Sequence, residues 1–141
     1  MPVLQGSSLS SYLACADLYA AAGVDLPHAP AVGLGSVCRR QATNEIGAIV
    51  TTLADRGMAL HGFGVKIDGI ARYGHLLASA DSMAWSTGAR YAPRMNGCTR
   101  RAVKCQNCAR YALRWCTKVV HTPVGWHQLS LMDATGTVHG F

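Results

Sequence analysis

The sequence has few acidic residues and no long apolar run. Asp and Glu together number seven against thirteen Lys and Arg, and Glu45 is the only glutamate. The resulting net charge of +6 favours a polyanionic partner, because neutralising phosphate groups rewards an excess of cations. No segment reaches the ~18 to 20 apolar residues that cross a bilayer, and residues 1–6 lack the charged-then-apolar order of a signal peptide. We therefore expect a cytoplasmic protein that does not enter a membrane.

Length and composition indicate a single globular domain. Half of the 141 residues are apolar and 14% are charged, which is typical of a packed interior and not of a disordered, charge-rich segment. A chain of this size buries roughly two-thirds of its unfolded surface. A mini-protein or a disordered tail is therefore excluded.

Short apolar runs alternate with helical patterns along the first 81 residues. Strands are expected at residues 2–6, 31–35, 58–63 and 77–81, and helices at residues 10–22, 43–57 and 67–77. In the second helix Thr43 is a candidate N-cap, and Gly57 follows its last turn. Alternating β and α units predict parallel strands joined by right-handed crossovers.

Two architectures fit these β/α units. A whole (β/α)8 TIM barrel takes ~250 residues, so four units would form half of one, equivalent to its strands 5 to 8. The other possibility is a small doubly wound, flavodoxin-like sheet. We expect an α/β half barrel over residues 1–92, a zinc knuckle with a helix over residues 93–120, and a divergent tail over residues 121–141.

Each expected strand ends in a polar or glycine-rich segment. In parallel α/β folds the carboxyl ends of the strands gather at one rim, where ligands bind. Gly33 and Gly35 could let a backbone approach the edge of a base, or could form an ordinary turn. Phe63 could stack on a base or belong to the core, and Asp81 could be a nucleophile or a helix N-cap.

Taken together, these segments resemble the second half of the tRNA-guanine transglycosylase family. They are most similar to its branch of deazapurine DNA modification proteins, and the resemblance spans about residues 2–116. The matching segments, in chain order before the cysteine cluster, are Val3-Leu4-Gln5-Gly6, Val32-Gly33-Leu34-Gly35-Ser36-Val37-Cys38-Arg39-Arg40, Leu60-His61-Gly62-Phe63-Gly64-Val65-Lys66 and Ser79 to Ser86.

The resemblance implies exchange of guanine in DNA or tRNA for a 7-deazaguanine through a covalent aspartyl-sugar intermediate. Asp81 matches the nucleophilic aspartate, and Gln5 matches the glutamine that hydrogen-bonds the base. Gly33 and Leu34 match the backbone that reads the edge of the base, and Phe63 replaces an apolar residue that sandwiches it. Many tRNA enzymes continue after the aspartate with Cys-Val-x-Pro-Thr-Arg, whereas residues 82–86 read Ser-Met-Ala-Trp-Ser.

Such enzymes read an extruded base in a pocket and hold the nucleic-acid backbone with cations. The basic side chains available for that purpose are Arg39, Arg40, Lys66, Arg90, Arg94, Arg100 and Arg101.

The cysteines suggest a structural Zn2+ site. Because the sequence has no export signal, its six cysteines are expected to be thiols or metal ligands in preference to disulfides. Cys98, Cys105 and Cys108 combine a CxxC pair with a third soft thiolate, which suits tetrahedral zinc. If a helix follows Cys108, Cys116 lies about 12 Å along its axis and cannot bind the same ion. His121 is possible only if that helix ends early, and three unligated thiols are the alternative to a metal site.

The acid/base residue that the family takes from the first half of its barrel has no counterpart in this sequence. A half barrel also has two unpaired strand edges and an uncovered apolar interior. We therefore expect a homodimer or a separate N-terminal half-barrel chain to complete the enzyme, unless the sequence comes from a truncated reading frame. The alternatives are a non-catalytic, zinc-containing remnant that binds nucleic acid and a flavodoxin-like protein that binds a small ligand.

Overall fold

The computed structural model describes residues 1–98 and 104–123. In chain order the elements are β1 (Val3–Leu4), α1 (Leu9–Ala21), β2 (Val32–Leu34), α2 (Asn44–Asp55), β3 (Leu60–Gly62), α3 (Ile67–Tyr73), η1 (Gly74–Leu76), β4 (Leu77–Ala80), α4 (Ala84–Tyr91), η2 (Cys105–Asn107) and α5 (Ala109–Val120). The predicted mixed α/β fold with parallel strands is confirmed. No helix within the described ranges has the length and apolar character needed to span a membrane.

The four strands form one parallel sheet in the order β1-β2-β3-β4. Successive strands are neighbours, without the reversal of strand order that a doubly wound sheet has at its switch point. This order is compatible with half of a barrel and does not support the flavodoxin-like alternative. Within the described chain β1 and β4 each pair on one side only.

The helices begin and end where local chemistry satisfies their backbone groups. Thr43 Oγ1 accepts a hydrogen bond from Ile46 N at 3.3 Å, as expected for the N-cap of α2. Gly57, with φ of 81°, comes immediately after Arg56, the C-cap of that helix. Helix α1 begins at a capping box formed by Ser8 and Ser11, and Gly23 has φ of 78° beyond its last turn.

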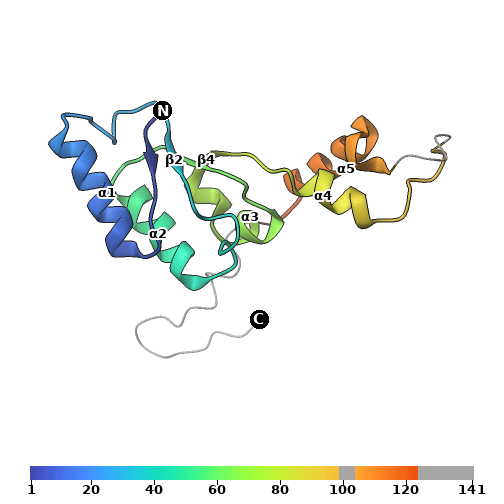
Figure 1. Cartoon of the computed structure of the whole chain (residues 1–141), viewed down its shortest axis with the longest axis horizontal. Helices are drawn as coiled ribbons and strands as arrows, with labels where there is room; N and C mark the ends of the chain where they lie inside the picture. Colours follow the sequence, from blue (N-terminus) through green and yellow to red (C-terminus); the bar gives the residue numbers. More distant parts are fainter. Residues whose placement is uncertain (99–103, 124–141) are drawn as a thin grey trace.

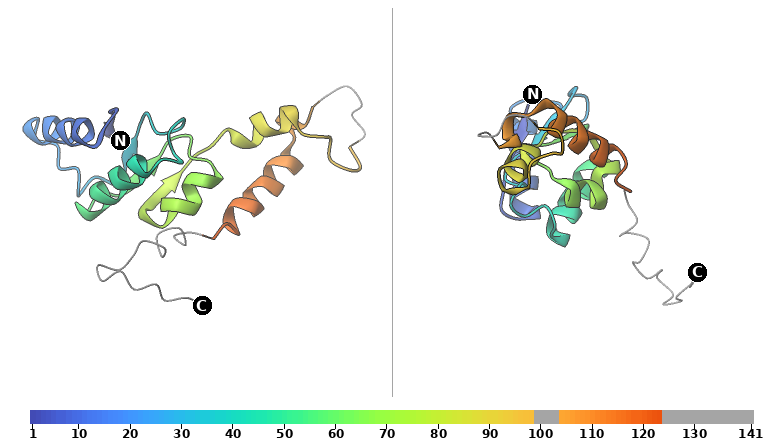
Figure 2. Two further views of the ribbon diagram at one scale, coloured as in Figure 1. Left: turned by 90° about the horizontal axis from the view of Figure 1, so that it is seen from below. Right: turned by 90° about the vertical axis from the view of Figure 1, so that its right-hand side faces the viewer.

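Helices α1, α2 and α3 cover one face of the sheet, and Figure 2 shows them side by side in chain order. Successive strand residues point to opposite faces. The side chains that meet the helices form one buried core, to which the strands contribute Leu4, Val32, Leu34 and Leu60, and the helices Tyr12, Ile46, Ile49, Val50, Leu53 and Tyr73. Burial of these apolar groups is what holds the β/α units together.

The opposite face carries a different row of residues. The register aligns Val3 with Gly33, Gly33 with His61, and His61 with Ser79. None of these four belongs to the buried core. In a closed barrel this face would be the interior. Here it holds small and polar groups next to the strand ends.

Helices α4 and α5 pack against each other and against η2, apart from the sheet core. Figure 1 shows α4 and α5 beyond one end of the sheet. Ala89 of α4 and Cys105 of η2 are buried in this part of the molecule.

Candidate active site

Asp81 stands immediately after β4, and its carboxylate is fixed to the turn after β3. Gly64 N donates to Asp81 Oδ1 at 2.6 Å, and Asp81 N donates to Gly62 O at 3.2 Å. The side chain is 59% exposed. A carboxylate held by one oxygen and open to solvent at the other is available to a ligand. Gly64 has φ of 66°, a conformation that favours glycine.

The helix-cap alternative for Asp81 does not describe its contacts. The N-cap of α4 is Met83, which makes no side-chain cap. Ser82 Oγ instead accepts from Ala84 N at 3.2 Å. The Asp81 side chain is directed to the β3–α3 turn, away from a capping role in the helix that follows it.

His61 lies beside Asp81 on the face of the sheet opposite the helices. His61 Nε2 is 3.7 Å from Asp81 Oδ2, and His61 Nδ1 is 2.8 Å from Ser79 Oγ. Its side chain is 19% exposed. His61 belongs to the segment Leu60-His61-Gly62-Phe63-Gly64, but no role was predicted for it. The signal that could have identified it is strand alternation, which puts residue 61 on the same face as residues 63 and 33.

Phe63 packs over Gly33 and against His61. The Phe63 and His61 rings meet edge to face, with centroids 4.7 Å apart and an interplanar angle of 73°. A Cβ atom at position 33 would lie 2.6 Å from Phe63 Cε2. Glycine at this position therefore lets the aromatic ring lie against the sheet. The Gly33 N–H itself donates to Pro2 O at 2.8 Å and takes part in the sheet.

The side chain of Leu34 points to the core, where it is 1% exposed. Leu34 O accepts from Phe63 N at 3.4 Å. Only the backbone of this residue is therefore on the side of the candidate site.

Gln5 follows β1 and lies along Gly35, which follows β2. A Cβ atom at position 35 would be 2.9 Å from Gln5 Cγ and 3.3 Å from Gln5 Cδ. From the core side, Tyr12 Oη donates to Gly35 O. Burial raises the pKa of Tyr12 above its usual value, against the opposing effect of Arg40, so the hydroxyl stays a donor. The Tyr12 hydroxyl thus fixes the Gly35 backbone, along which the Gln5 side chain lies.

Gln41, which the sequence analysis did not identify, joins the loops after β2 and β3. It is buried, its Nε2 donates to Cys38 O at 3.0 Å, and its Oε1 accepts from Lys66 N. A buried amide with both ends bonded gives the two loops one relative position. Those loops carry Cys38 and Gly64, and a cavity of about 360 Å³ lies between them and the start of α4.

This cavity borders the turn that binds the Asp81 carboxylate. Its walls include Gly64, which binds Asp81, and Ser82, which follows Asp81 in the chain. Lys66 adds a cation to the wall. A volume of this size falls within the range of small-molecule sites, about 300 to 1,000 Å³.

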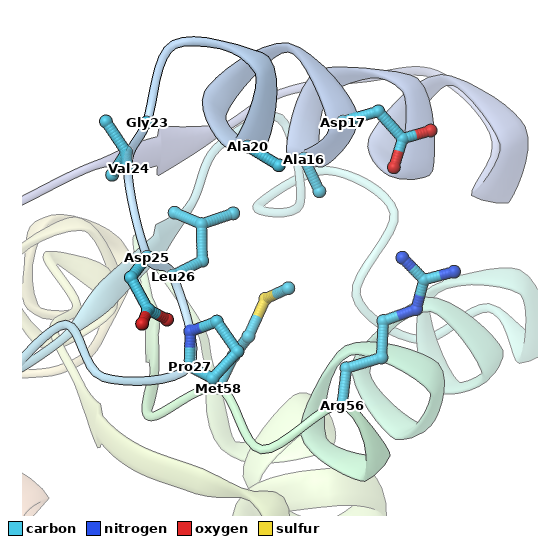
Figure 3. A pocket seen from close by; sticks show the side chains of 10 residues that line it. All are labelled: Ala16, Asp17, Ala20, Gly23, Val24, Asp25, Leu26, Pro27, Arg56 and Met58. Carbon is cyan, nitrogen blue, oxygen red and sulfur yellow. The ribbon is translucent and has the colours of Figure 1, made fainter.

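A second cavity, of about 480 Å³, lies at the other end of the sheet (Figure 3). Met58, which precedes β3, and Leu26 and Pro27, which precede β2, form part of its wall together with Asp17 and Arg56. In barrel-type folds ligands bind at the carboxyl ends of the strands. This cavity is at the amino ends and contains none of the candidate residues.

Cys98, Cys105 and Cys108 line one cavity of about 320 Å³. Cys98 N donates to Met95 O at 3.1 Å, and Cys108 N donates to Cys105 O at 3.0 Å, so two of the thiols stand on tight turns. Among residues 1–98 and 104–123, no three His, Cys, Asp or Glu side chains come together in a group that could hold a metal ion. Residues 99–103 lie outside the described ranges, and with them the candidate cations Arg100 and Arg101.

The expected helix after Cys108 is confirmed, because α5 extends from Ala109 to Val120. It does not end early, which is the condition that the His121 ligand required. His121 Nδ1 is instead 2.7 Å from Thr117 O. Cys116 is exposed on the helix. Most of the expected tail, residues 124–141, lies outside the described ranges.

One family model matches almost the whole chain. It is described as DpdA, DeoxyPurine in DNA protein A, and it matches residues 1–137. No curated protein and no solved structure matches the chain.

Proposed function

The chain belongs to the DpdA family, DeoxyPurine in DNA protein A, and from this premise we propose that it exchanges guanine in DNA for a 7-deazaguanine. The observation that carries the proposal is the Asp81 carboxylate, anchored through Oδ1 at a strand end and 59% exposed. The family description favours DNA over tRNA as the substrate. The full transglycosylase mechanism rests on the resemblance of the motifs around Gln5, Gly33, Phe63 and Asp81.

Asp81 acts as the nucleophile in two displacements at the sugar C1′. In the first, a carboxylate oxygen bonds to C1′, the bond from C1′ to guanine breaks, and its electron pair leaves with guanine, which takes up a proton. In the second, the ring nitrogen of the 7-deazaguanine bonds to C1′ and loses its proton, while the aspartyl ester bond breaks and restores the carboxylate. Two inversions give retention at the anomeric carbon.

The residues at the carboxyl ends of the other strands would bind the extruded base. The Gln5 amide offers a donor and an acceptor for its edge, and Phe63 offers an aromatic face for stacking. Gly33 keeps Phe63 close to the sheet, and Leu34 contributes its backbone. His61 lies beside the second oxygen of Asp81, with Nε2 3.7 Å from Oδ2.

The catalytic unit contains a second half barrel. In the described chain β1 and β4 are edges, and the face that bears His61 and Phe63 is not covered by α1, α2 or α3. Unpaired edges and an open face are satisfied by further strands. A second copy of this chain or a separate N-terminal half-barrel chain would supply these strands. The acid/base residue, which has no counterpart in this sequence, would come from the separate chain.

The test is incorporation of labelled guanine or 7-deazaguanine into DNA and tRNA. Wild type is compared with Asp81→Ala. Each is assayed alone and mixed with a candidate N-terminal half-barrel chain. Asp68→Ala is the matched control, because Asp68 is exposed on α3. Incorporation into DNA that survives Asp68→Ala and is abolished by Asp81→Ala is expected. Equal incorporation by wild type and Asp81→Ala, or none in any pairing, would reject the enzyme in favour of a non-catalytic DNA-binding remnant.

We also propose that Cys98, Cys105 and Cys108 hold a structural Zn2+. Support comes from their common cavity and from the soft thiolate donors. Bound zinc would hold the turn at Cys98 and the turn at Cys105–Cys108 together within the 93–120 segment, and it has no part in the exchange. Mass spectrometry of freshly purified native protein tests this: one zinc per chain in wild type and in Cys15→Ser, and none in Cys105→Ser. Zinc-free wild type would reject the site.

A further inference from the structure

The charges of this chain are strongly separated along the sequence. Residues 82–132 contain eight of the thirteen Lys and Arg and no Asp or Glu, whereas residues 1–81 contain five Lys and Arg and six acids. The excess positive charge therefore belongs to the part of the molecule that includes α4 and α5. The half barrel itself is close to neutral.

Within residues 82–132, helix α5 carries a row of cations along one side. Arg110, Arg114 and Lys118 follow each other at intervals of four residues, so they lie along the same side of the helix. All three are exposed. Like charges at this spacing repel each other. A bound anion removes that repulsion.

The row of cations borders a groove of about 820 Å³ between α5 and residues 92–96. Arg94 lines the groove from the opposite wall. Arg110 Nη2 reaches Asn96 O at 3.5 Å, which links the two walls. No acidic residue is among those that line it.

Two half-buried aromatic residues also line the groove. Tyr111 and Trp115 are one turn apart on α5, each next to one of the arginines. A groove that combines cations with aromatic faces has the chemistry of a single-strand binding surface, where phosphates meet the cations and unpaired bases stack on the rings. Paired bases in a duplex do not offer their faces.

We propose that this groove, lined by Arg94, Arg110, Arg114, Lys118, Tyr111 and Trp115, binds an unpaired strand of DNA. The inference rests on the proposed function in one respect, the choice of DNA as the nucleic acid. It adds a second contact surface, separate from the strand ends that carry Asp81. The groove holds the strand by its phosphates and by stacking on Trp115, and it does not read the sequence.

The first experiment measures binding of a fluorescent, mixed-sequence single-stranded DNA to the full chain by anisotropy across a salt titration, without any 7-deazaguanine. The variant Arg110→Gln/Arg114→Gln is compared with Arg56→Gln/Arg72→Gln, which removes the same charge from the half barrel. We expect the groove variant to bind about tenfold more weakly and its salt slope to fall by about 1.4, since each phosphate contact to a single strand contributes about 0.7. The control variant should bind as wild type does.

The second experiment separates stacking from charge. Trp115→Leu should weaken binding of the single strand several-fold and leave the salt slope unchanged, because stacking releases no counterions. Its thermal unfolding is measured in parallel to establish that the variant is folded. Heparin, a polyanion without bases, should bind wild type and Trp115→Leu equally.

Two results would overturn the proposal that the groove binds an unpaired strand. One is equal DNA binding by the groove variant and its control. The other is a Trp115→Leu variant that loses affinity for heparin as much as for DNA. Either result is independent of the exchange reaction, because Asp81→Ala is expected to bind the oligonucleotide as wild type does. If exchange is absent but the groove variant still loses DNA binding, the proposed enzyme fails and the groove stands.

Discussion

His61 Nε2 lies 3.7 Å from Asp81 Oδ2, while the other carboxylate oxygen accepts from Gly64 N at 2.6 Å. The imidazole is itself oriented by Ser79 and by the Phe63 ring. Both oxygens of the candidate nucleophile thus face groups of β3 and the turn that follows it. The first oxygen is hydrogen-bonded to the turn, and the second lies beside the imidazole and is open to a ligand.

We expect His61→Asn to reduce the exchange rate by about 10², the lower range for loss of a positioned imidazole. Single-stranded DNA binding should not change, because His61 is not among the residues that line the α5 groove. Single-turnover incorporation and anisotropy provide the two readouts. Ser79→Ala, which removes only the partner of the imidazole, should have a smaller effect. Exchange by His61→Asn at the wild-type rate would show that the imidazole is dispensable.

Apolar periodicity and turn residues were sufficient to predict the β/α order. Thr43 and Gly57 delimit α2 as expected, because a cap and a C-terminal glycine act locally. The strand expected at residues 58–63 is only Leu60–Gly62, since strand ends depend on which neighbours pair. The roles of His61 and Gln41 could not be read locally. They depend on contacts with Ser79 and Lys66, which are 18 and 25 residues away.

Gly33 offers a direct test of the packing under Phe63. In Gly33→Ala the new Cβ would be 2.6 Å from Phe63 Cε2 and 3.2 Å from Val3 Cγ2, so the ring must move. We expect a loss of about 1 to 3 kcal/mol in the free energy of unfolding and weaker binding of the 7-deazaguanine. Urea denaturation and isothermal titration measure the two effects.

Gly47→Ala is the matched control for that substitution. Gly47 lies in α2, and nothing would be within 4 Å of a new Cβ. Alanine should therefore stabilise the protein by about 0.5 to 1 kcal/mol. Equal stability changes in the two variants would contradict the close packing of Phe63 on Gly33.

The buried hydroxyl of Tyr73 should make the stability of the protein depend on alkaline pH. Burial raises the pKa of Tyr73 to about 12 from the usual 10.0. Because the folded-state pKa is the higher one, the contribution to stability is complete below pH 10 and is lost as the pH rises towards 12. The Tyr73 hydroxyl is buried, and within the described residues it has no hydrogen-bond partner.

Tyr73→Phe removes both the ionisable group and the unpaired hydroxyl. The variant should be more stable than wild type by about 1 kcal/mol at pH 7, and its advantage should grow between pH 10 and 12. Urea denaturation at pH 7, 10 and 11.5 measures the difference. Tyr19→Phe, at a partly buried position that packs against the core, is the comparison. Parallel alkaline losses in wild type and Tyr73→Phe would assign the effect to other groups, such as Tyr12, whose pKa is also raised.

The hydrogen bonds of Gln41 should contribute both to the stability of the protein and to the order of the two loops beside Asp81. Gln41→Ala would leave Lys66 N and Cys38 O without the partners they have in the native protein. We expect a loss of about 1 to 2 kcal/mol in the free energy of unfolding, for the removal of two partly buried hydrogen bonds. The two loops that border the cavity beside Asp81 would also lose their common link, so amide exchange around Gly64 should accelerate. Gln106→Ala, which removes only the partner of the exposed Arg90, should change neither quantity, because water replaces an exposed hydrogen bond at little cost.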